Sequence, residues 1–268
     1  MFDEGNVKEF TQQGYTIVDL VNRDKLKNFK QDLYDLILKK INKYKIKINQ
    51  SVSESDEDYI LHEGMIHLER ADHAYLSEIY NIVGFSSAVY NIIADENIIS
   101  CVNKILGKRS TNNLFLNSIS CRMDPPGDSP YVYGWHKDRN TNIAGSSFVQ
   151  FWAPAICDLR ADIGGLIVSP RSHRNTEVRT TRTDQEREDH YSGRAVRCPS
   201  DTMPINYDTN ALHLELKLGQ ALLFSPDLLH KSAINQSAMQ MRYCFTCMYH
   251  DPLYSGFKFM NLNVKGKV

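Results

Sequence analysis

The chain has 268 residues, 42% of them hydrophobic, and carries 31 Lys and Arg against 32 Asp and Glu. A chain of this length can bury roughly three quarters of its unfolded surface, so one apolar core is sufficient without disulfides. The balanced charge gives no overall field that would attract nucleic acid or a membrane surface, and neither is expected as a partner. No apolar run approaches the roughly 18 residues of a membrane helix, and the first residues lack a secretory signal, so we expect one cytoplasmic domain.

The first 110 residues are predicted to be mainly helical. Between residues 25 and 45, apolar side chains recur at the spacing of one helical face. They are Phe29, Leu33, Leu36, Ile37 and Ile41. The polar, acidic stretch 50–58 predicts a loop, and a second helical stretch runs from about residue 77 to residue 106, before Gly107. We expect this region to form a helical flank of the domain.

Residues 111–268 are predicted to form a β core. From residue 114 onward the hydrophobic period shortens and turn residues multiply, as at 125–128 and 162–165. Alternation along the strand 115–122, together with the turn around residues 131–133, predicts side chains that line a pocket. The polar connection 171–210 is longer than most connections between strands.

Six cysteines are scattered along the chain, and only Cys244 and Cys247 have a spacing that suggests a metal site. On a strand, this spacing puts the two thiols on opposite faces, and no second pair is in register. We therefore predict buried, reduced thiols.

The strongest candidate for a functional site is the segment Trp135-His136-Lys137-Asp138. Residues two apart on a strand project from the same face, so His136 and Asp138 can bind one ion while Lys137 points away. His230 follows the apolar strand 220–224 and a turn, which places it at the rim of a sheet. Two imidazoles and a carboxylate can hold Fe(II) on one side and leave positions open for a co-substrate and dioxygen.

Arg242 opens the strand-like run 243–249, after Ser232. A buried arginine there needs an anionic partner, because an unpaired charge in a barrel interior is very costly. Its planar guanidinium matches a carboxylate with two hydrogen bonds. Two partners remain open, namely the carboxylate of a bound molecule and a structural acidic residue of the chain.

The segment His67-Leu68-Glu69 repeats the His-x-acid pattern, which also occurs by chance. Helical surroundings would not place His67 and Glu69 on one face, and no arginine follows at a matching distance. We expect His67 and the other histidines outside the candidate site, including His173, to be structural or exposed.

The order His-x-Asp, then His-x-Ser-x-x-Asn-x-Ser, then Arg resembles the phytanoyl-CoA dioxygenase-like branch of the Fe(II)/2-oxoglutarate dioxygenases. The likeness covers most of the chain. It includes the opening segment 10–18, the segment 148–155, and the segment 164–173, in which Arg171 replaces the usual glycine. The resemblance implies an α+β fold with a double-stranded β-helix, or jelly-roll, core and helices packed around it.

The resemblance also implies roles for individual residues. The implied iron ligands are His136, Asp138 and His230. Arg242 and Ser232 would bind the distal carboxylate of 2-oxoglutarate, and Trp152 would line the co-substrate pocket. Lys137 occupies a position that can contact the co-substrate in the family, although strand geometry points it away.

The implied reaction is hydroxylation of a small molecule, in which dioxygen is consumed and 2-oxoglutarate is converted to succinate and carbon dioxide. Asp138 favours hydroxylation over halogenation, because related halogenases have a small residue in place of this carboxylate. In the family topology, 171–210 would cover the substrate. Its arginines suit a phosphorylated, phosphonate or carboxylate substrate, whereas a solvated loop also explains them.

Two other classes of function remain open. A cupin-like metal-dependent barrel uses similar ligands without 2-oxoglutarate, and Ser232 and Arg242 argue against it. A non-catalytic binding member of the family would usually have lost a metal ligand or the arginine, and this chain retains both.

Overall fold

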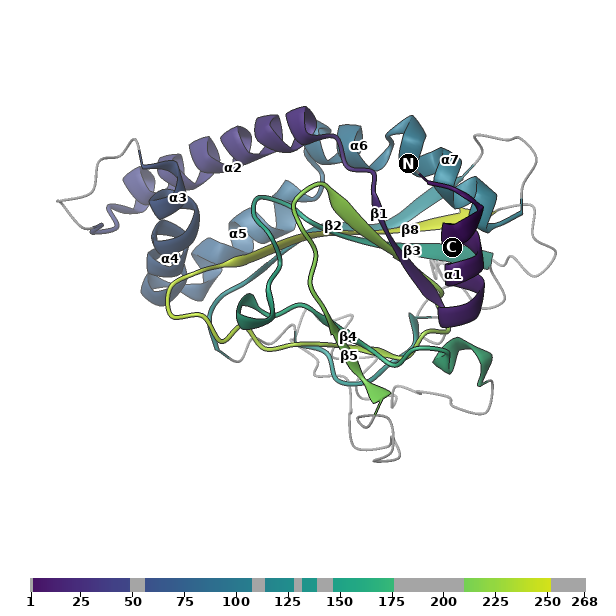
Figure 1. Ribbon diagram of the computed structural model, residues 1–268. Helices are drawn as coiled ribbons and strands as arrows, with labels where there is room; N and C mark the ends of the chain where they lie inside the picture. The colour runs from purple at the N-terminus through teal and green to yellow at the C-terminus, as the bar shows by residue number, and fades with distance from the viewer. Residues whose placement is uncertain are drawn as a thin grey trace, which may run out of the picture.

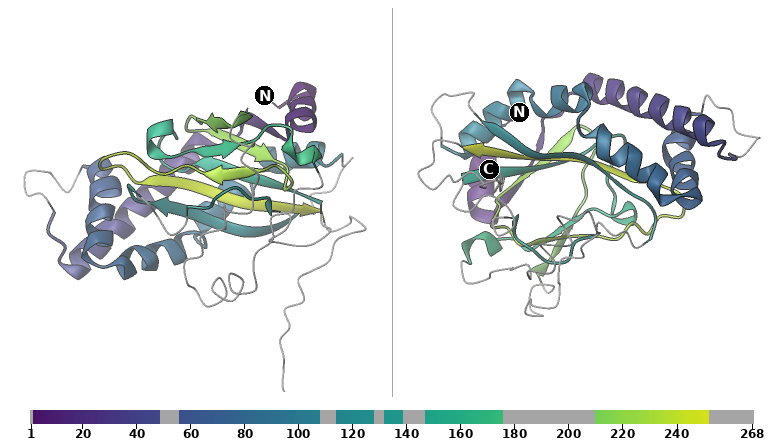
Figure 2. Two further views of the ribbon diagram at one scale, coloured as in Figure 1. Left: turned by 90° about the horizontal axis from the view of Figure 1, so that it is seen from below. Right: turned by 180° about the vertical axis from the view of Figure 1, so that it is seen from behind.

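The protein is arranged in three layers, which Figures 1 and 2 show from three directions. Helices cover one face of a five-stranded sheet, and a three-stranded sheet lies on the other side. The computed structural model describes residues 2–48, 56–107, 114–127, 132–138, 147–175 and 210–251. The expected helical flank and β core are both present, and within the described residues both sheets are antiparallel.

The N-terminal region consists of helices and one strand. In chain order these are α1 (Glu4–Gln13), β1 (Tyr15–Asp19), α2 (Arg23–Tyr44), α3 (Glu57–Tyr59), the π-helix η1 (Ile60–Gly64), α4 (Met65–Ala71), α5 (His73–Val83), α6 (Ser87–Ile93) and α7 (Glu96–Ile105). The stretch expected as one helix from residue 77 to 106 is therefore three. Ser86 and Asp95 each accept a hydrogen bond from the backbone of the next helix, so α6 and α7 start anew there.

Helix α2 follows the predicted stripe closely. The Asn22 side chain accepts hydrogen bonds from the first turn, and the helix ends at Lys45 in the left-handed conformation. Its buried residues are Leu26, Phe29, Leu33, Ile37 and Ile41. Phe29 packs edge-on against Phe245 of the large sheet, with ring centroids 4.8 Å apart.

The β region contains the remaining strands and two short 3-10 helices. They are β2 (Phe115–Asp124), β3 (Ser147–Pro154), η3 (Ala161–Ile163), β4 (Leu166–Val168), η4 (Ser172–Arg174), β5 (Leu212–Leu214), β6 (Gln220–Phe224), β7 (His230–Ser232) and β8 (Arg242–Asp251). The large sheet has the order β1-β6-β3-β8-β2, and the small sheet has the order β5-β4-β7.

Two apolar cores lie on the two faces of the large sheet. The core beneath the helices takes Tyr243, Phe245, Cys247 and Tyr249 from β8, whereas Cys244 belongs to the core between the sheets. This division follows from the period of two along a strand. It confirms that Cys244 and Cys247 face opposite ways, and burial raises the pKa of their thiols to about 11 and about 12.

Polar contacts with the helices also hold β8 in place. The Tyr243 hydroxyl donates to the Leu61 carbonyl of η1, and the Tyr249 hydroxyl donates to the Ile93 carbonyl of α6 at 2.6 Å. The backbone N–H of Met241 donates to His62 Nδ1 at 3.1 Å. A buried hydroxyl without a partner would be destabilising, so these bonds fix the register of β8 against the helices.

Most of the predicted lid, residues 176–209, lies outside the described residues, as does Cys198. In the part of the chain that the structure describes, no helix combines the length and apolar character needed to cross a membrane.

Gly14 links α1 to β1 and has a φ of 88°. A Cβ atom there would lie 2.5 Å from His173 Nδ1 and 2.9 Å from Leu228 Cδ1. We predict that Gly14→Ala lowers the free energy of unfolding by about 2–4 kcal/mol, through the left-handed backbone and the crowding together. Urea denaturation measures this loss.

Gly107 is the matched control, because its φ is 69° and, apart from its chain neighbours, no atom of the described residues lies within 4 Å of an added Cβ. Gly107→Ala should lose about 1 kcal/mol, from the backbone alone. Equal losses in the two variants would show that the packing of His173 and Leu228 around Gly14 contributes nothing.

Candidate active site

The two histidines singled out in the sequence meet through the backbone. His136 N–H donates to the His230 carbonyl at 2.9 Å, and His230 N–H donates to the His136 carbonyl at 3.1 Å. On its other side, His230 pairs with Val168 of β4. An antiparallel pair of this kind brings the two side chains close together, and their ring centroids are 4.1 Å apart.

Hydrogen bonds to the backbone fix the orientation of both rings. His136 Nδ1 lies 2.7 Å from the Gly134 carbonyl, and His230 Nδ1 lies 2.9 Å from the Leu228 carbonyl. A carbonyl oxygen can only accept, so each Nδ1 must carry the hydrogen. In a neutral imidazole of this tautomer Nε2 presents a lone pair, which is the form that binds a metal ion.

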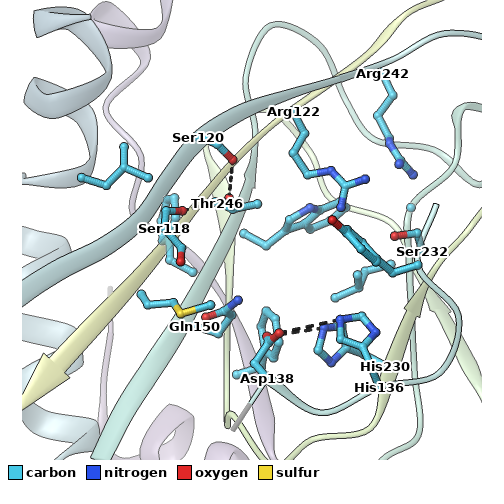
Figure 3. A pocket seen from close by; sticks show the side chains of 18 of the residues that line it. Ser118, Ser120, Arg122, His136, Asp138, Gln150, His230, Ser232, Arg242 and Thr246 are labelled. Carbon is cyan, nitrogen blue, oxygen red and sulfur yellow. Dashed lines mark hydrogen bonds and ion pairs between the residues drawn. The ribbon is translucent and has the colours of Figure 1, made fainter. Parts of the chain in front are cut away.

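Asp138 completes the group (Figure 3). Its Oδ1 is 3.7 Å from His136 Nε2, and its Oδ2 is 3.6 Å from His230 Nε2. These separations are too long for hydrogen bonds but suit atoms that share an ion, because ligand distances to such ions are about 2.0–2.2 Å. The three ligand atoms lie within 4.8 Å of one another, and this donor set fits Fe(II).

Lys137 lies on the other side of the segment, as strand geometry predicts. Its side chain is buried, and Nζ donates to the Asn175 carbonyl at 2.7 Å and the Ser172 carbonyl at 3.3 Å. It is not among the residues that line the cavity at the metal ligands. The structure therefore does not support the contact between Lys137 and the co-substrate that its position in the family implied. His136 forms an isolated bridge rather than part of a long strand, yet Asp138 still shares its side.

A cavity of about 350 Å³ opens beside the histidines. Trp152, Ser232 and Arg242 are among the residues that line it. The predicted pocket strand and turn also contribute, through Ser118, Ile119, Ser120, Arg122 and Tyr133. The segment was identified from sequence, but three consecutive residues of β2 face the cavity, which simple alternation does not predict.

Arg242 is held firmly at the edge of this cavity. Nε and Nη2 lie 2.8 and 2.7 Å from Asp124 Oδ2, while Nη1 donates to the Gly164 and Ala233 carbonyls, both at 2.9 Å. The structural acidic partner that the sequence left open is therefore Asp124. The guanidinium still borders the cavity.

Asp124 serves a second arginine, because Arg122 Nη2 donates to its Oδ1 at 3.2 Å. Burial alone would raise the pKa of Asp124, but the charges and hydrogen bonds of Arg122 and Arg242 hold it below its ordinary value. These three residues together carry two positive charges and one negative. Sequence reasoning missed Asp124, although Ser120, Arg122 and Asp124 alternate as polar residues along one face of β2.

The alternative His-x-acid pair does not form a site. His67 and Glu69 lie on α4, and Glu69 is 3.7 Å from His73 instead. His173 Nε2 lies 3.1 Å from the Thr11 carbonyl, outside the cavity. Within the described residues, the only group of three or more side chains that could bind a metal ion together consists of His136, Asp138 and His230.

Solved structures with a similar fold include three that were determined with bound ligands. EvdO2 from Micromonospora carbonacea var. aurantiaca, complexed with 2-oxoglutarate, is 13% identical over 94% of this chain and 91% of its own, with a TM-score of 0.58. The epimerase SnoN, in complex with Fe3+, alpha ketoglutarate and nogalamycin RO, is 10% identical over 92% and 83%, with a TM-score of 0.58. EctD from S. alaskensis, with 2-oxoglutarate and 5-hydroxyectoine, is 15% identical over 92% and 76%, with a TM-score of 0.56.

At these identities the similarity shows a common fold. Among curated proteins, no match is found. The family model described as phytanoyl-CoA dioxygenase (PhyH) matches residues 10–244, which is most of the chain. The chain therefore belongs to the phytanoyl-CoA dioxygenase (PhyH) family.

Proposed function

We propose that the protein is a non-haem Fe(II)/2-oxoglutarate-dependent dioxygenase that hydroxylates a small molecule. The observation that carries this proposal is the convergence of two imidazoles, one carboxylate and a buried arginine on a single cavity. The three similar structures support it, since their names record 2-oxoglutarate or alpha ketoglutarate in each. The two facing antiparallel sheets are, on this proposal, the halves of a double-stranded β-helix.

His136, Asp138 and His230 would hold the iron on one side, which leaves its cavity-facing side for 2-oxoglutarate and dioxygen. Bound iron supplies the activation of dioxygen that converts 2-oxoglutarate to succinate and carbon dioxide and oxidises the substrate. The Nδ1 bonds to Gly134 and Leu228 keep both rings turned so that Nε2 remains available.

The distal carboxylate of 2-oxoglutarate requires a cationic partner in a cavity of this kind. Arg242 and Ser232 both border the cavity, and the Asp124–Arg122–Arg242 group carries an excess positive charge. Because Arg242 is already fixed by Asp124, Gly164 and Ala233, little side-chain freedom is lost when an anion binds. The arrangement disfavours a cupin-like enzyme that uses no 2-oxoglutarate.

Apolar side chains around the metal ligands exclude water from the reacting centre. Trp152, Leu166 and Phe224 line the cavity and are all buried. A low-polarity wall strengthens the attraction between the arginines and a bound carboxylate. The buried free thiols also suit a reducing compartment, and we propose the cytoplasm as the location.

The first prediction of this proposal concerns the metal ligands. His136→Ala, Asp138→Ala or His230→Ala should lower Fe(II) affinity by about 100-fold or more, because even outer partners of ligands contribute about 10–100-fold. Anaerobic titration with Fe(II) and then 2-oxoglutarate measures this through the visible charge-transfer band of a chelated 2-oxo acid. His67→Ala is the control and should retain the band, and a full band in any ligand variant would exclude that residue.

The second prediction concerns the anion. Arg242→Gln should weaken 2-oxoglutarate binding by about 10–100-fold, since a hydrogen bond to a charged group contributes about 1.5–3 kcal/mol. Fe(II) binding in the absence of 2-oxoglutarate should persist, which also shows that the variant folds. Arg160→Gln, at an exposed arginine paired with Asp162, should change neither value. Unchanged 2-oxoglutarate affinity in the Arg242 variant would remove this residue from the co-substrate site.

A further inference from the structure

A second polar wall of the cavity is formed by residues other than the metal ligands and the arginines. Ser118 and Ser120 of β2, Gln150 of β3 and Thr246 of β8 line it together. Figure 3 shows these four residues at the left of the cavity and Arg242 and Ser232 at the right, with Asp138 below. We call this group of four the hydroxyl wall.

Gln150 contributes a buried polar atom to the hydroxyl wall. It is 8% exposed, and its Oε1 accepts no hydrogen bond within the described part of the chain. It lies in the middle of the sheet, paired with Phe224 on one side and Met248 on the other. Buried amides without partners are rare because each is destabilising, so a donor from a bound molecule is the simplest explanation.

A β-bulge shapes the rest of the wall. The register of β2 against β8 shifts between Asn117 and Ser120, and Ser118 has a φ of 51°. The shift leaves Ser120 opposite Thr246, whose hydroxyls lie 2.8 Å apart. Bulges often redirect side chains beside active sites, and a left-handed serine is unfavourable unless the surroundings require it.

Helix α5 supports the bulge from behind through Gly84. An added Cβ at Gly84 would lie 3.1 Å from Ser120 Cα and 3.2 Å from the Ile119 carbonyl. Only a residue without a side chain allows the helix end to approach the bulged strand so closely. The position of the two serines in the cavity is thus fixed by the packing of α5 as well as by the sheet.

The hydroxyl wall contains no charged side chain. Hydroxyls and a carboxamide both donate and accept, so they match groups that do the same, such as the hydroxyls of a polyol or sugar. An alkyl chain would leave Gln150 Oε1 without a donor, and a carboxylate would place acceptor against acceptor there. Ile119 and Met248 line the same region and offer apolar contacts to C–H groups between the hydroxyls.

We propose that the hydroxyl wall binds neutral hydroxyl groups of the organic substrate, which is therefore a polyol or sugar rather than a fatty acyl chain. This inference rests on the proposed function, because the wall would present a C–H bond of that substrate to the metal site. The charge of each part of the cavity then determines where 2-oxoglutarate and the organic substrate bind. The anionic co-substrate lies at the arginines, and the neutral substrate lies at Ser118, Ser120, Gln150 and Thr246.

The test uses the protein loaded with Zn(II) and 2-oxoglutarate, with binding followed by saturation-transfer NMR titration. The probes are glycerol, myo-inositol and methyl glucoside, compared with cyclohexanol and hexanoate. At least one polyol should bind about tenfold more tightly than cyclohexanol, as expected for one or more additional hydrogen bonds. Tighter binding of cyclohexanol or hexanoate, or no polyol binding at all, would overturn the proposal.

Gln150→Leu removes the amide at similar volume. Affinity for the bound polyol should fall about tenfold, whereas the 2-oxoglutarate charge-transfer band with Fe(II) should remain. The melting temperature without substrate should rise by about 2–4 °C, because a buried group without a partner is removed. A lower melting temperature would instead show that Gln150 stabilises the sheet, and would overturn its assignment as a ligand-binding residue.

Gln31→Leu, on an exposed part of α2, is the matched control and should change neither polyol affinity nor the band. Thr246→Val tests the wall a second time, since it removes the hydroxyl next to Ser120 and keeps the shape. It should lower polyol affinity several-fold. Loss of the band in the wild-type protein would refute the proposed function, whereas a normal band without polyol binding would refute this inference alone.

Discussion

Strand β8 contributes side chains to two parts of the interior, because they alternate between the core beneath the helices and the space between the sheets. Tyr243, Phe245, Cys247 and Tyr249 lie in the core beneath the helices, while Arg242, Thr246 and Met248 line the cavity. A shift of one residue would exchange the two sets and bury the arginine among helices. The bonds from Tyr243 to η1 and from Tyr249 to α6 oppose such a shift. The helical layer therefore determines which residues reach the cavity, although it contributes few of them.

The same alternation explains how a charged group is tolerated inside the sheet. Asp124 lies opposite Arg242 in the register of β2 and β8, so the two charges face one another across adjacent strands. Removing Asp124 would take the acidic partner from the buried Arg242, which is strongly destabilising, whereas Asp124 would keep its contact with Arg122 if Arg242 were replaced. The carbonyls of Gly164 and Ala233 accept two further hydrogen bonds from the same guanidinium. An arginine held by four bonds changes little when an anion arrives, which favours a preorganised site.

The cavity has different chemistry on its two sides, and each side depends on a different structural element. The positively charged side lies where β2 and β8 pair in regular register, whereas the hydroxyl wall depends on a bulge supported by Gly84. The two histidine ligands are positioned separately, by one pair of backbone hydrogen bonds that joins His136 to His230. The hydroxyl wall and the charged side both include residues of β2 and β8, whereas the bridge between His136 and His230 lies outside these two strands. Substitutions in the wall should therefore leave the two histidines in place.

The sequence by itself determined the elements whose signals are local. The stripe on α2, the helical flank and the shortened period beyond residue 114 all follow from side-chain spacing, as does the opposite orientation of Cys244 and Cys247. The ordered motif from His136 to Arg242 sufficed to predict the group that converges on the cavity. Only the tertiary structure decided that Asp124 is the partner of Arg242, that Lys137 bonds to Ser172 and Asn175, and that Gln150 faces the cavity with no described donor to its Oε1. These facts depend on strand register, a bulge and contacts between residues far apart in the chain, and no local pattern encodes such distances.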